Sequence, residues 1–445
     1  MKIIERGVTP QRAVAKRVTR AAALGSVCAA LILQTSQVHA ETTLRVWTRS
    51  SADARVTYDL IADAFTKKTG IKVEYFNAMT DYEQRLARAI AGNDLPDVII
   101  DDSSSLGLMT RTNVAAEVDR KTFPHTADID EHAWQGAQSY NGKYYAVPVS
   151  VQSFVYFIRK DWREKLGLPV PKTWDDIARL SKAMTDGKPA GADKQVYGFT
   201  FPGSATRGYT TWFMSSFVWQ AGGDFIRPDG KGKFHGALDE PAAATTVAYF
   251  RKMMCTDKSM QPGAINATTA DAITSFRAGQ SGILLSGPYH ISVVDKEPGR
   301  NKVEVVSVPA GPTGRTDSLG EGELGYVTRS ANRSAALAYL DFLTSPDGQT
   351  IGMHPGGFPV VRLPVNQKVD AGKVYNDPRW QTVADVYRKD AHYVPAIPDW
   401  MSLRQVTADG LNRILSSCDS DIAGGLKDLN TKVNRELARQ HVAAN

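Results

Sequence analysis

One stretch of the chain, residues 142–177, constrains the fold more than any other. It reads GKYYAVPVSVQSFVYFIRKDWREKLGLPVPKTWDDI. An apolar run interrupted by Pro148 is followed by the polar pair Gln152 and Ser153, and then by a second strand-like run at 154–158. Such a pattern is typical of a chain that leaves one sheet and enters another. The stretch therefore predicts a passage between two lobes.

The end of this stretch carries the signals of a helix start. Thr173 is a good N-cap residue, and Asp175 and Asp176 favour the positive end of a helix. A shorter helix is expected at 161–166, stopped by Gly167. Two strands followed by helices are thus predicted within these residues.

Before this stretch, strand-like and helix-like segments alternate. Strands are expected at 44–47, 71–75 and 97–100, and helices at 54–68 and 81–91. This alternation predicts βαβ units and a parallel sheet, in which ligands bind beyond the carboxyl ends of the strands. Five candidate ligand-binding residues follow those ends: Trp47, Ser50, Ser51, Asp102 and Ser103. We expect at least one of Asp101 and Asp102 to face the crevice.

Charge is distributed unevenly along the chain. The 445 residues are enough for two lobes or domains, and the formal net charge is +6. Residues 1–40 account for +5 of this charge, which leaves +1 for the remainder. The basic character belongs to the N-terminal segment, so it gives no reason to expect a nucleic-acid surface.

The N-terminal segment has the three parts of a secretory signal peptide. Residues 1–20 are basic, residues 21–33 are apolar, and Val38, His39 and Ala40 form a small-x-small site. We expect cleavage after Ala40 and a periplasmic protein. An uncleaved membrane anchor is the alternative. Cys28 has no lipobox around it, which argues against a lipoprotein.

Five segments in a fixed order connect the chain to a known family. They are AFTKKTGIKVEY (64–75), GNDLPDVII (92–100), residues 142–177, FRAGQSGILLSGPY (276–289) and ALAYLDFLTSPDGQ (336–349). Through them the chain resembles family 1 of the extracellular solute-binding proteins. This is the maltose-binding-protein-like group of carbohydrate-binding components of bacterial ABC importers. The resemblance covers most of residues 44–430.

The resemblance implies an α/β, two-lobed periplasmic binding protein fold. Each lobe would be a mostly parallel sheet flanked by helices, and the chain would cross between lobes three times. The N-terminal lobe would hold residues 41–150 plus 286–328, and the C-terminal lobe residues 151–285 plus 329–445. The hinge residues would be Pro148, Ser153, Gly287 and Gly325.

The resemblance also places Cys255 and Cys418 in the C-terminal lobe. Two cysteines in an oxidising compartment can pair, although the sequence does not fix the distance between their Cα atoms. A disulfide and two buried free thiols remain equally open.

A sugar site needs flat aromatic rings for the apolar ring faces and polar groups for the hydroxyls. The aromatic candidates are Trp212, Trp219, Tyr289 and Trp400, although buried aromatics more often pack in cores. Tyr289 is the strongest of them, because it follows Gly-Pro at an expected crossing.

The polar candidates for the hydroxyls are Gln152, Glu323 and Arg362, with Glu321 and Arg207 as weaker ones. Arg362 matches the corresponding family segment imperfectly. Trp162 and Trp174 are expected to be structural.

Other formal motifs carry no function here. Residues 320–325 satisfy G-x-G-x-x-G but lead into a strand, and their two glutamates would repel a pyrophosphate. The eight histidines are scattered, so neither a metal site nor a cofactor is expected.

The leading hypothesis is a monomeric, non-enzymatic binding protein that closes on a carbohydrate and delivers it to the permease subunits of an ABC importer. A binding protein for a polyamine, a phosphorylated polyol or ferric ion is one alternative. The other is a secreted glycoside hydrolase. Its carboxylate pair would be Asp101 or Asp102 with Glu321 or Glu323, and Asp102 with Glu323 is the preferred pair.

Overall fold

The computed structural model describes residues 42–79, 81–329 and 332–444. The expected signal peptide, its cleavage site after Ala40, and Cys28 lie outside the described residues. Residues 41–445 form one unit by their internal contacts, and two sheets are its framework.

The first sheet has the order β12-β11-β3-β1-β2, with β4 also paired to β11. β1 is parallel to both β2 and β3, as the alternating segments predict. β11 is antiparallel to β3 and β4. The strands are β1 (Thr43–Thr48), β2 (Lys72–Asn77), β3 (Val98–Asp102), β4 (Val147–Ser153), β11 (Ser318–Val327) and β12 (Ala391–His392).

The second sheet has the order β10-β5-β9-β6. Its strands are β5 (Val155–Arg159), β6 (Tyr197–Thr200), β9 (Ser281–Ser286) and β10 (Val303–Val306). β5 is antiparallel to β9 and to β10, and β6 is parallel to β9. The expectation of a mostly parallel sheet in each lobe is therefore corrected for this sheet, because strand direction depends on connections that local patterns do not encode.

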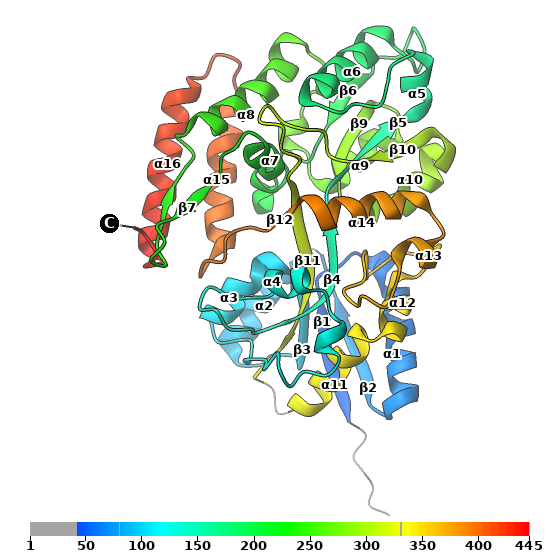
Figure 1. The fold of residues 1–445 in the computed structure, drawn as a ribbon, viewed down its shortest axis with the longest axis vertical. Coiled ribbons are helices and arrows are strands. Elements are labelled where there is room, and N and C mark those ends of the chain that lie inside the picture. Colours follow the sequence, from blue (N-terminus) through cyan, green and yellow to red (C-terminus); the bar gives the residue numbers. More distant parts are fainter. Residues whose placement is uncertain (1–41, 80, 330–331, 445) are drawn as a thin grey trace, which may run out of the picture. The chain divides into compact units, whose positions relative to one another are not determined.

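Helices cover both sheets (Figure 1). Those before β5 are α1 (Arg55–Thr69), α2 (Tyr82–Gly92), α3 (Leu106–Arg111) and α4 (Glu131–Gly136). Those in the middle of the chain are α5 (Lys160–Lys165), α6 (Trp174–Gly187), α7 (Tyr209–Gln220), α8 (Pro241–Arg251), α9 (Thr269–Arg277) and α10 (Ile291–Val294). The strands β7 (Ile226–Pro228) and β8 (Phe234–Gly236) form a hairpin outside both sheets.

The C-terminal part adds α11 (Arg333–Thr344), α12 (Pro346–Met353), α13 (Ala371–Tyr375), α14 (Pro378–Asp390), α15 (Trp400–Leu415) and α16 (Ile422–Arg439). α11 and α12 pack against α1, so they stay with the first sheet. α14 contacts β4, β11 and β10 and thus touches both sheets (Figure 1). α15 packs against α16 and α7.

The predicted start of α6 is confirmed. The Thr173 side chain accepts a hydrogen bond from the backbone N–H of Asp176, and the Asp176 carboxylate accepts one in return from the Thr173 N–H. This capping box satisfies two backbone donors that a helix start leaves free. The side chain of Trp174 is buried behind it, in the structural position expected.

The first predicted passage lies where the sequence places it. Ser153 ends β4 in the first sheet, opposite Gly320, and Val155 begins β5 in the second sheet, opposite Ser286. Phe154 is the single residue between them. Pro148 lies inside β4, opposite Leu324, where the strand pairing shifts register.

The other two passages differ from the expectation. After β9 the chain remains with the second sheet, because β10 pairs with β5, and it reaches the first sheet only at Ser318. The second passage is therefore at 307–317 rather than at Gly287. Gly325 lies within β11, between Ile100 and Val147, so it is inside a sheet and not at a passage. The third passage follows α12, between residues 354 and 399.

Cys255 and Cys418 form a disulfide, with their Cα atoms 5.9 Å apart. Cys255 lies in the turn after α8, and Cys418 lies between α15 and α16. The bond therefore ties the end of one helix to the connection between two others. Of the two possibilities that the sequence leaves open, the structure has the disulfide.

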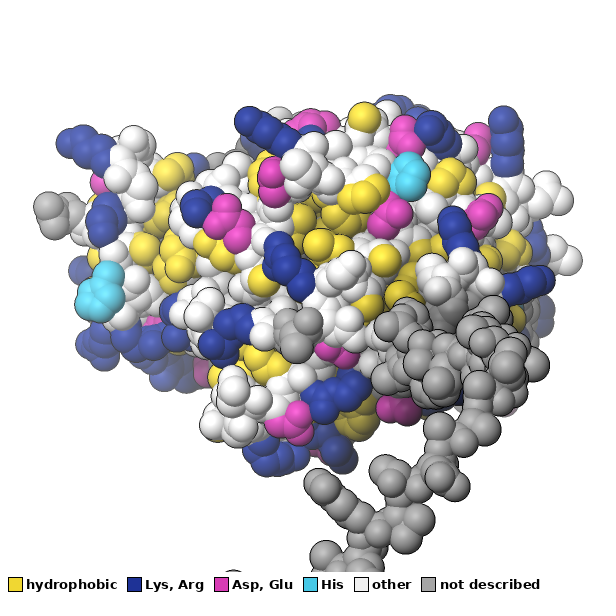
Figure 2. Space-filling view, turned by 90° about the horizontal axis from the view of Figure 1, so that it is seen from below, with side chains coloured by type: hydrophobic (Ala, Val, Ile, Leu, Met, Phe, Trp, Pro, Cys, Tyr) yellow, Lys and Arg dark blue, Asp and Glu magenta, His cyan; other side chains and the backbone are white. Residues whose placement is uncertain are grey.

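Charges are mixed on the face shown in Figure 2. Lys and Arg side chains lie there among Asp, Glu and neutral polar side chains. This agrees with the near-neutral balance of the chain beyond residue 40. Within the described part of the chain, no helix combines the length and the apolar character that a membrane span requires.

Candidate ligand-binding site

A cavity of about 670 Å³, counting its solvent-open mouth, lies beside the β4–β5 passage. Polar side chains reach it from the ends of β1 and β3 and from β4 and β11. Aromatic side chains reach it from α7 and from the turn after β9. Eight residues predicted from the sequence line it: Ser50, Ser51, Asp102, Gln152, Trp212, Tyr289, Glu323 and Arg362. The cavity thus draws on both sheets.

Four predicted residues do not line this cavity. Trp47 packs against Phe76 within the first sheet, with ring centroids 5.1 Å apart. Trp219 is buried, stacks on His392 and donates a hydrogen bond to Asp224 (3.1 Å). Trp400 is buried against Phe225. These aromatics follow the ordinary tendency to fill cores. The fourth residue, Ser103, borders two smaller neighbouring voids.

Strand register explains how the acidic side chains meet. Glu321 lies opposite Gln152 of β4, and Glu323 lies opposite Asp102 of β3. Because side chains alternate along a strand, Glu321 and Glu323 project from the same face of β11. The sequence places residues 320–325 before a strand, and this expectation is wrong, since they lie within the ten-residue strand Ser318–Val327.

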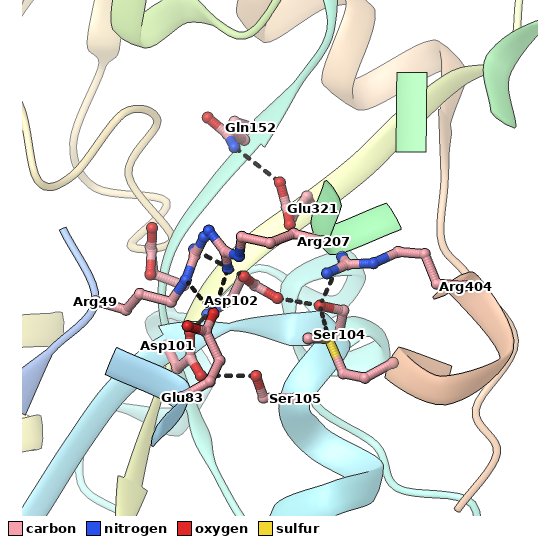
Figure 3. Close-up of polar contacts among 12 residues, drawn as sticks. Arg49, Glu83, Asp101, Asp102, Ser104, Ser105, Gln152, Arg207, Glu321 and Arg404 are labelled. Carbon is pink, nitrogen blue, oxygen red and sulfur yellow. Dashed lines mark hydrogen bonds and ion pairs between the residues drawn. The ribbon is translucent and has the colours of Figure 1, made fainter. Parts of the chain in front are cut away.

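Asp102 is held by arginine at the end of β3. Arg49 Nη1 lies 3.0 Å from Asp102 Oδ2, and the Ser104 hydroxyl donates to the other carboxylate oxygen. Burial opposes ionisation of Asp102, but the charges of Arg49 and Arg404 and the Ser104 hydrogen bond outweigh it and lower its pKa. Figure 3 shows Arg49, Arg207 and Arg404 directed toward this aspartate from different elements.

The neighbouring Asp101 points away from the cavity. Its carboxylate accepts hydrogen bonds from the Ser105 hydroxyl (2.7 Å) and from the backbone N–H of Asp102 (2.9 Å). Burial, with the adjacent charge of Asp102, raises the pKa of Asp101 to about 7. Of the two aspartates, Asp102 is therefore the one that faces the cavity.

Glu321 and Glu323 have different environments. The Arg362 guanidinium forms an ion pair with the Glu323 carboxylate and lies 6.0 Å from the centroid of the Tyr289 ring. Glu321 accepts a hydrogen bond from the Gln152 amide (3.0 Å). Burial, reinforced by the charges of Asp102 and Glu323, raises the pKa of Glu321 to about 8.

The aromatic wall of the cavity is one face of α7. Tyr209, Trp212 and Phe213 are spaced at i, i+3 and i+4, and all three line the cavity. Phe213 stacks on Phe154, with ring centroids 4.5 Å apart. The Arg404 guanidinium lies 4.5 Å from the Trp212 ring centroid. The Trp212 ring is thus fixed between core aromatics and a buried cation.

Sequence reasoning missed several lining residues. They are Arg49, Met79, Phe154, Tyr209, Phe213, Thr269 and Phe358, together with Glu321, which was only a weaker candidate. Arg49 directly precedes Ser50, so the rule that selected Ser50 applies to it as well. Helical spacing to Trp212 could have found Tyr209 and Phe213. Arg404 contacts Ser104 from 300 residues away, and no local signal predicts that contact.

Among the residues that the structure describes, no group of three or more His, Cys, Asp or Glu is arranged to hold a metal ion. The formal G-x-G-x-x-G at 320–325 lies within β11, where the strand–turn–helix context of a nucleotide site does not exist.

Comparison with known proteins gives the family. The sequence model of the bacterial extracellular solute-binding proteins matches residues 50–350. A Brucella abortus (strain 2308) protein named as a binding protein is 25% identical over 302 residues, which covers 67% of this chain and 69% of that protein. FusA, a fructooligosaccharide ABC transporter substrate-binding protein of Streptococcus pneumoniae serotype 4, is 25% identical over 307 residues, 62% of this chain and 56% of its own.

A solved structure agrees at the level of the fold. An ABC transporter solute-binding protein of Thermotoga lettingae TMO, bound with alpha-D-tagatose, has a TM-score of 0.76 and 22% identity, covering 89% of this chain and 100% of that one. This likeness confirms the two-lobed α/β fold. Since the family model also matches well over half of the sequence, the chain belongs to the bacterial extracellular solute-binding proteins.

Proposed function

We propose that the protein captures a carbohydrate between its two lobes and delivers it to the permease subunits of an ABC importer. One observation carries this proposal above the others. A single cavity combines aromatic rings with a ring of hydroxyl, amide, carboxylate and guanidinium groups, and both sheets contribute to it. This is the combination that sugars require, since their ring faces are apolar and their edges carry hydroxyls.

Two buried polar atoms support a ligand rich in hydroxyls. The Oγ of Ser51 and the Oε1 of Gln152 have no hydrogen-bond partner among residues 42–79, 81–329 and 332–444, and both residues line the cavity. Buried polar atoms of this kind are normally satisfied. Ligand hydroxyls or waters would supply the missing partners. The names of FusA, which refers to fructooligosaccharide, and of the tagatose-bound structure point in the same direction.

The lobes are proposed to close by bending at the three passages. The strand pairings favour passages at Phe154, at 307–317 and between 354 and 399. An ion pair joins Glu83 of α2, on the first sheet, to Arg207 before α7, with Arg207 Nη2 2.6 Å from Glu83 Oε1. A contact of this kind forms as two lobes approach, so it suits a closed arrangement.

The hydrolase alternative is less well supported. Both members of its carboxylate pair are engaged by arginine, Asp102 by Arg49 and Glu323 by Arg362. The general acid of a glycosidase needs a raised pKa, which Glu321 has and Asp102 does not. The carboxylates that would have to serve Glu321 as nucleophile or base, Asp102 and Glu323, are each paired with an arginine. We therefore infer a binding protein without catalysis. From the basic, apolar and small-x-small parts of residues 1–40 we also propose secretion after cleavage at Ala40, and from the family resemblance a monomer.

The function is tested with the purified mature chain and a panel of mono- and oligosaccharides. Native mass spectrometry first identifies any ligand that co-purifies. Tryptophan fluorescence and thermal unfolding should then show saturable binding, because Trp212 lines the cavity. Release of reducing sugar by catalytic amounts of protein would overturn the proposal, as would tight binding of an anion with no response to any sugar.

A further inference from the structure

Three carboxylates line the cavity, and they differ in whether an arginine forms an ion pair with them. Asp102 is paired with Arg49 and Glu323 with Arg362. Glu321 has no Lys, Arg or His nitrogen within 4.0 Å among the residues that the structure describes, and its hydrogen-bond partner is the neutral amide of Gln152. Its side chain is nonetheless buried, with 6% of the residue exposed. An ionised carboxylate in such a place needs a counter-charge.

The charged groups around Glu321 are of both signs, and the pKa of Glu321 shows that the acidic groups and burial prevail. Asp102 faces it from β3 and Glu323 from its own strand. The cations Arg404 of α15 and Arg362, between α12 and α13, also interact with it, while Gln152 and Tyr289 are uncharged. Burial and the two acidic neighbours raise the pKa of Glu321 to about 8, and Gln152 and Arg404 oppose this to a smaller extent. At pH 7 the ligand-free protein therefore holds Glu321 mostly protonated, and a bound cation would ionise it by displacing this proton.

The aromatic wall is also suited to a cation. The Arg404 guanidinium lies 4.5 Å from the Trp212 ring centroid, and that of Arg362 lies 6.0 Å from the Tyr289 ring centroid. Both rings therefore already stabilise a cation through their electron-rich faces. A ligand ammonium beside Glu321 would lie among rings of the same kind.

We propose that the ligand is a carbohydrate with a free amino group, whose ammonium pairs with the Glu321 carboxylate. This inference rests on the proposed carbohydrate function and names the substrate class of the same cavity. Ser51 Oγ and Gln152 Oε1, which have no partner within the described part of the chain, favour a polyhydroxylated amine over a simple diamine, because a diamine offers no hydroxyl to satisfy them.

The test compares amino sugars with the sugars that carry a hydroxyl at the same carbon. Isothermal titration calorimetry at pH 7 uses glucosamine with glucose, galactosamine with galactose, and mannosamine with mannose, and adds N-acetylglucosamine and putrescine. A charge-assisted hydrogen bond predicts that at least one amino sugar binds roughly 10- to 100-fold more tightly than its hydroxyl partner. N-acetylation, which removes the charge, should abolish that gain.

The variant Glu321→Gln keeps the shape of the side chain and removes its charge. It should bring the amino-to-hydroxyl affinity ratio close to one. Glu117→Gln is the control, since it also removes one negative charge but lies at an exposed surface pair with Lys143. The control should retain the ratio. Thermal unfolding of both variants verifies that they are folded, and the sugar pairs test the unmodified protein independently of any variant.

The outcomes separate this inference from the function on which it rests. If neutral sugars bind as tightly as their amino counterparts, or if Glu321→Gln retains the preference, the amino-sugar proposal is overturned and the carbohydrate function stands. If putrescine binds and no sugar does, both are overturned. If nothing in the panel binds, the amino-sugar proposal is also rejected, while oligosaccharide titrations still test the carbohydrate function.

Discussion

Arg49 Nη1 lies 3.0 Å from Asp102 Oδ2 where two parallel strands end, and the two side chains are only 10% and 6% exposed. The pair closes the end of the cavity that β1 and β3 supply. The same guanidinium reaches toward Glu83, with Nε 3.4 Å from Oε1. Arg49 thus connects the neighbouring ends of β1 and β3 to α2.

Loss of Arg49 should destabilise the fold. Arg49→Met keeps much of the volume but leaves Asp102 buried without its closest cation. Breaking a buried ion pair by removing one partner typically costs about 3–5 kcal/mol. Urea denaturation followed by circular dichroism measures the free energy of unfolding. A loss below about 1 kcal/mol, the size of an exposed pair, would contradict a structural role for this contact.

Loss of the Tyr289 ring should weaken ligand binding. Tyr289 lines the cavity and follows Gly287 and Pro288 at the end of β9. We expect Tyr289→Ala to reduce affinity by about 1–3 kcal/mol, on the scale of other buried aromatic contacts, and Tyr289→Phe to reduce it less. Trp219→Phe is the control, because Trp219 is a buried aromatic of α7 that does not line the cavity. Titration calorimetry with the identified sugar measures all three, and unchanged affinity of Tyr289→Ala removes this ring from the site.

The stability of the ligand-free protein should depend on pH through Glu321. Its pKa rises from the ordinary 4.5 to about 8 in the folded state, so the folded protein holds this proton more tightly than the unfolded chain does. The contribution of Glu321 to stability therefore falls by up to about 1.4 kcal/mol per pH unit between pH 4.5 and 8, and is constant above.

Comparison with Glu321→Gln isolates this effect, because the other titrating groups are common to both proteins. The free energy of unfolding of the variant, relative to the natural protein, should increase with pH over that interval. Chemical denaturation at several pH values gives the difference. A difference that is independent of pH would show that Glu321 ionises normally in the folded state.

Reduction of the Cys255–Cys418 disulfide should destabilise the protein. The bond joins residues 163 positions apart, and long closed loops restrict the unfolded chain strongly. Replacement of both cysteines by serine should lower the free energy of unfolding by about 2–5 kcal/mol. Thermal unfolding with and without a reducing agent provides the measurement. The serine variant is the control, since a reducing agent should leave its melting temperature unchanged.

Local features were predictable wherever neighbouring residues determine the outcome. Thr173 caps α6 through Asp176, three residues along, and the passage at Phe154 follows from a polar break between two strand-like runs. Residues 318–327 show the opposite case. Their glycines disfavour a strand on propensity alone. They nevertheless form one, because β3 pairs with them on one side and β4 on the other. A Cβ at Gly322 would lie 2.7 Å from the Ser150 carbonyl oxygen, so the close approach of β4 requires glycine there.

The sequence by itself determined the family, the alternating elements of the first sheet, the first passage between sheets and most of the polar residues at the strand ends. It could do so because periodicity and capping are encoded by residues within a few positions of one another. The tertiary structure decided which side chains meet. Trp212 and Trp219 share a helix and similar chemistry, but only Trp212 lines the cavity. Among the described residues, arginines form ion pairs with Asp102 and Glu323 but not with Glu321, because each pairing depends on how distant elements pack, and packing is a property of the whole chain.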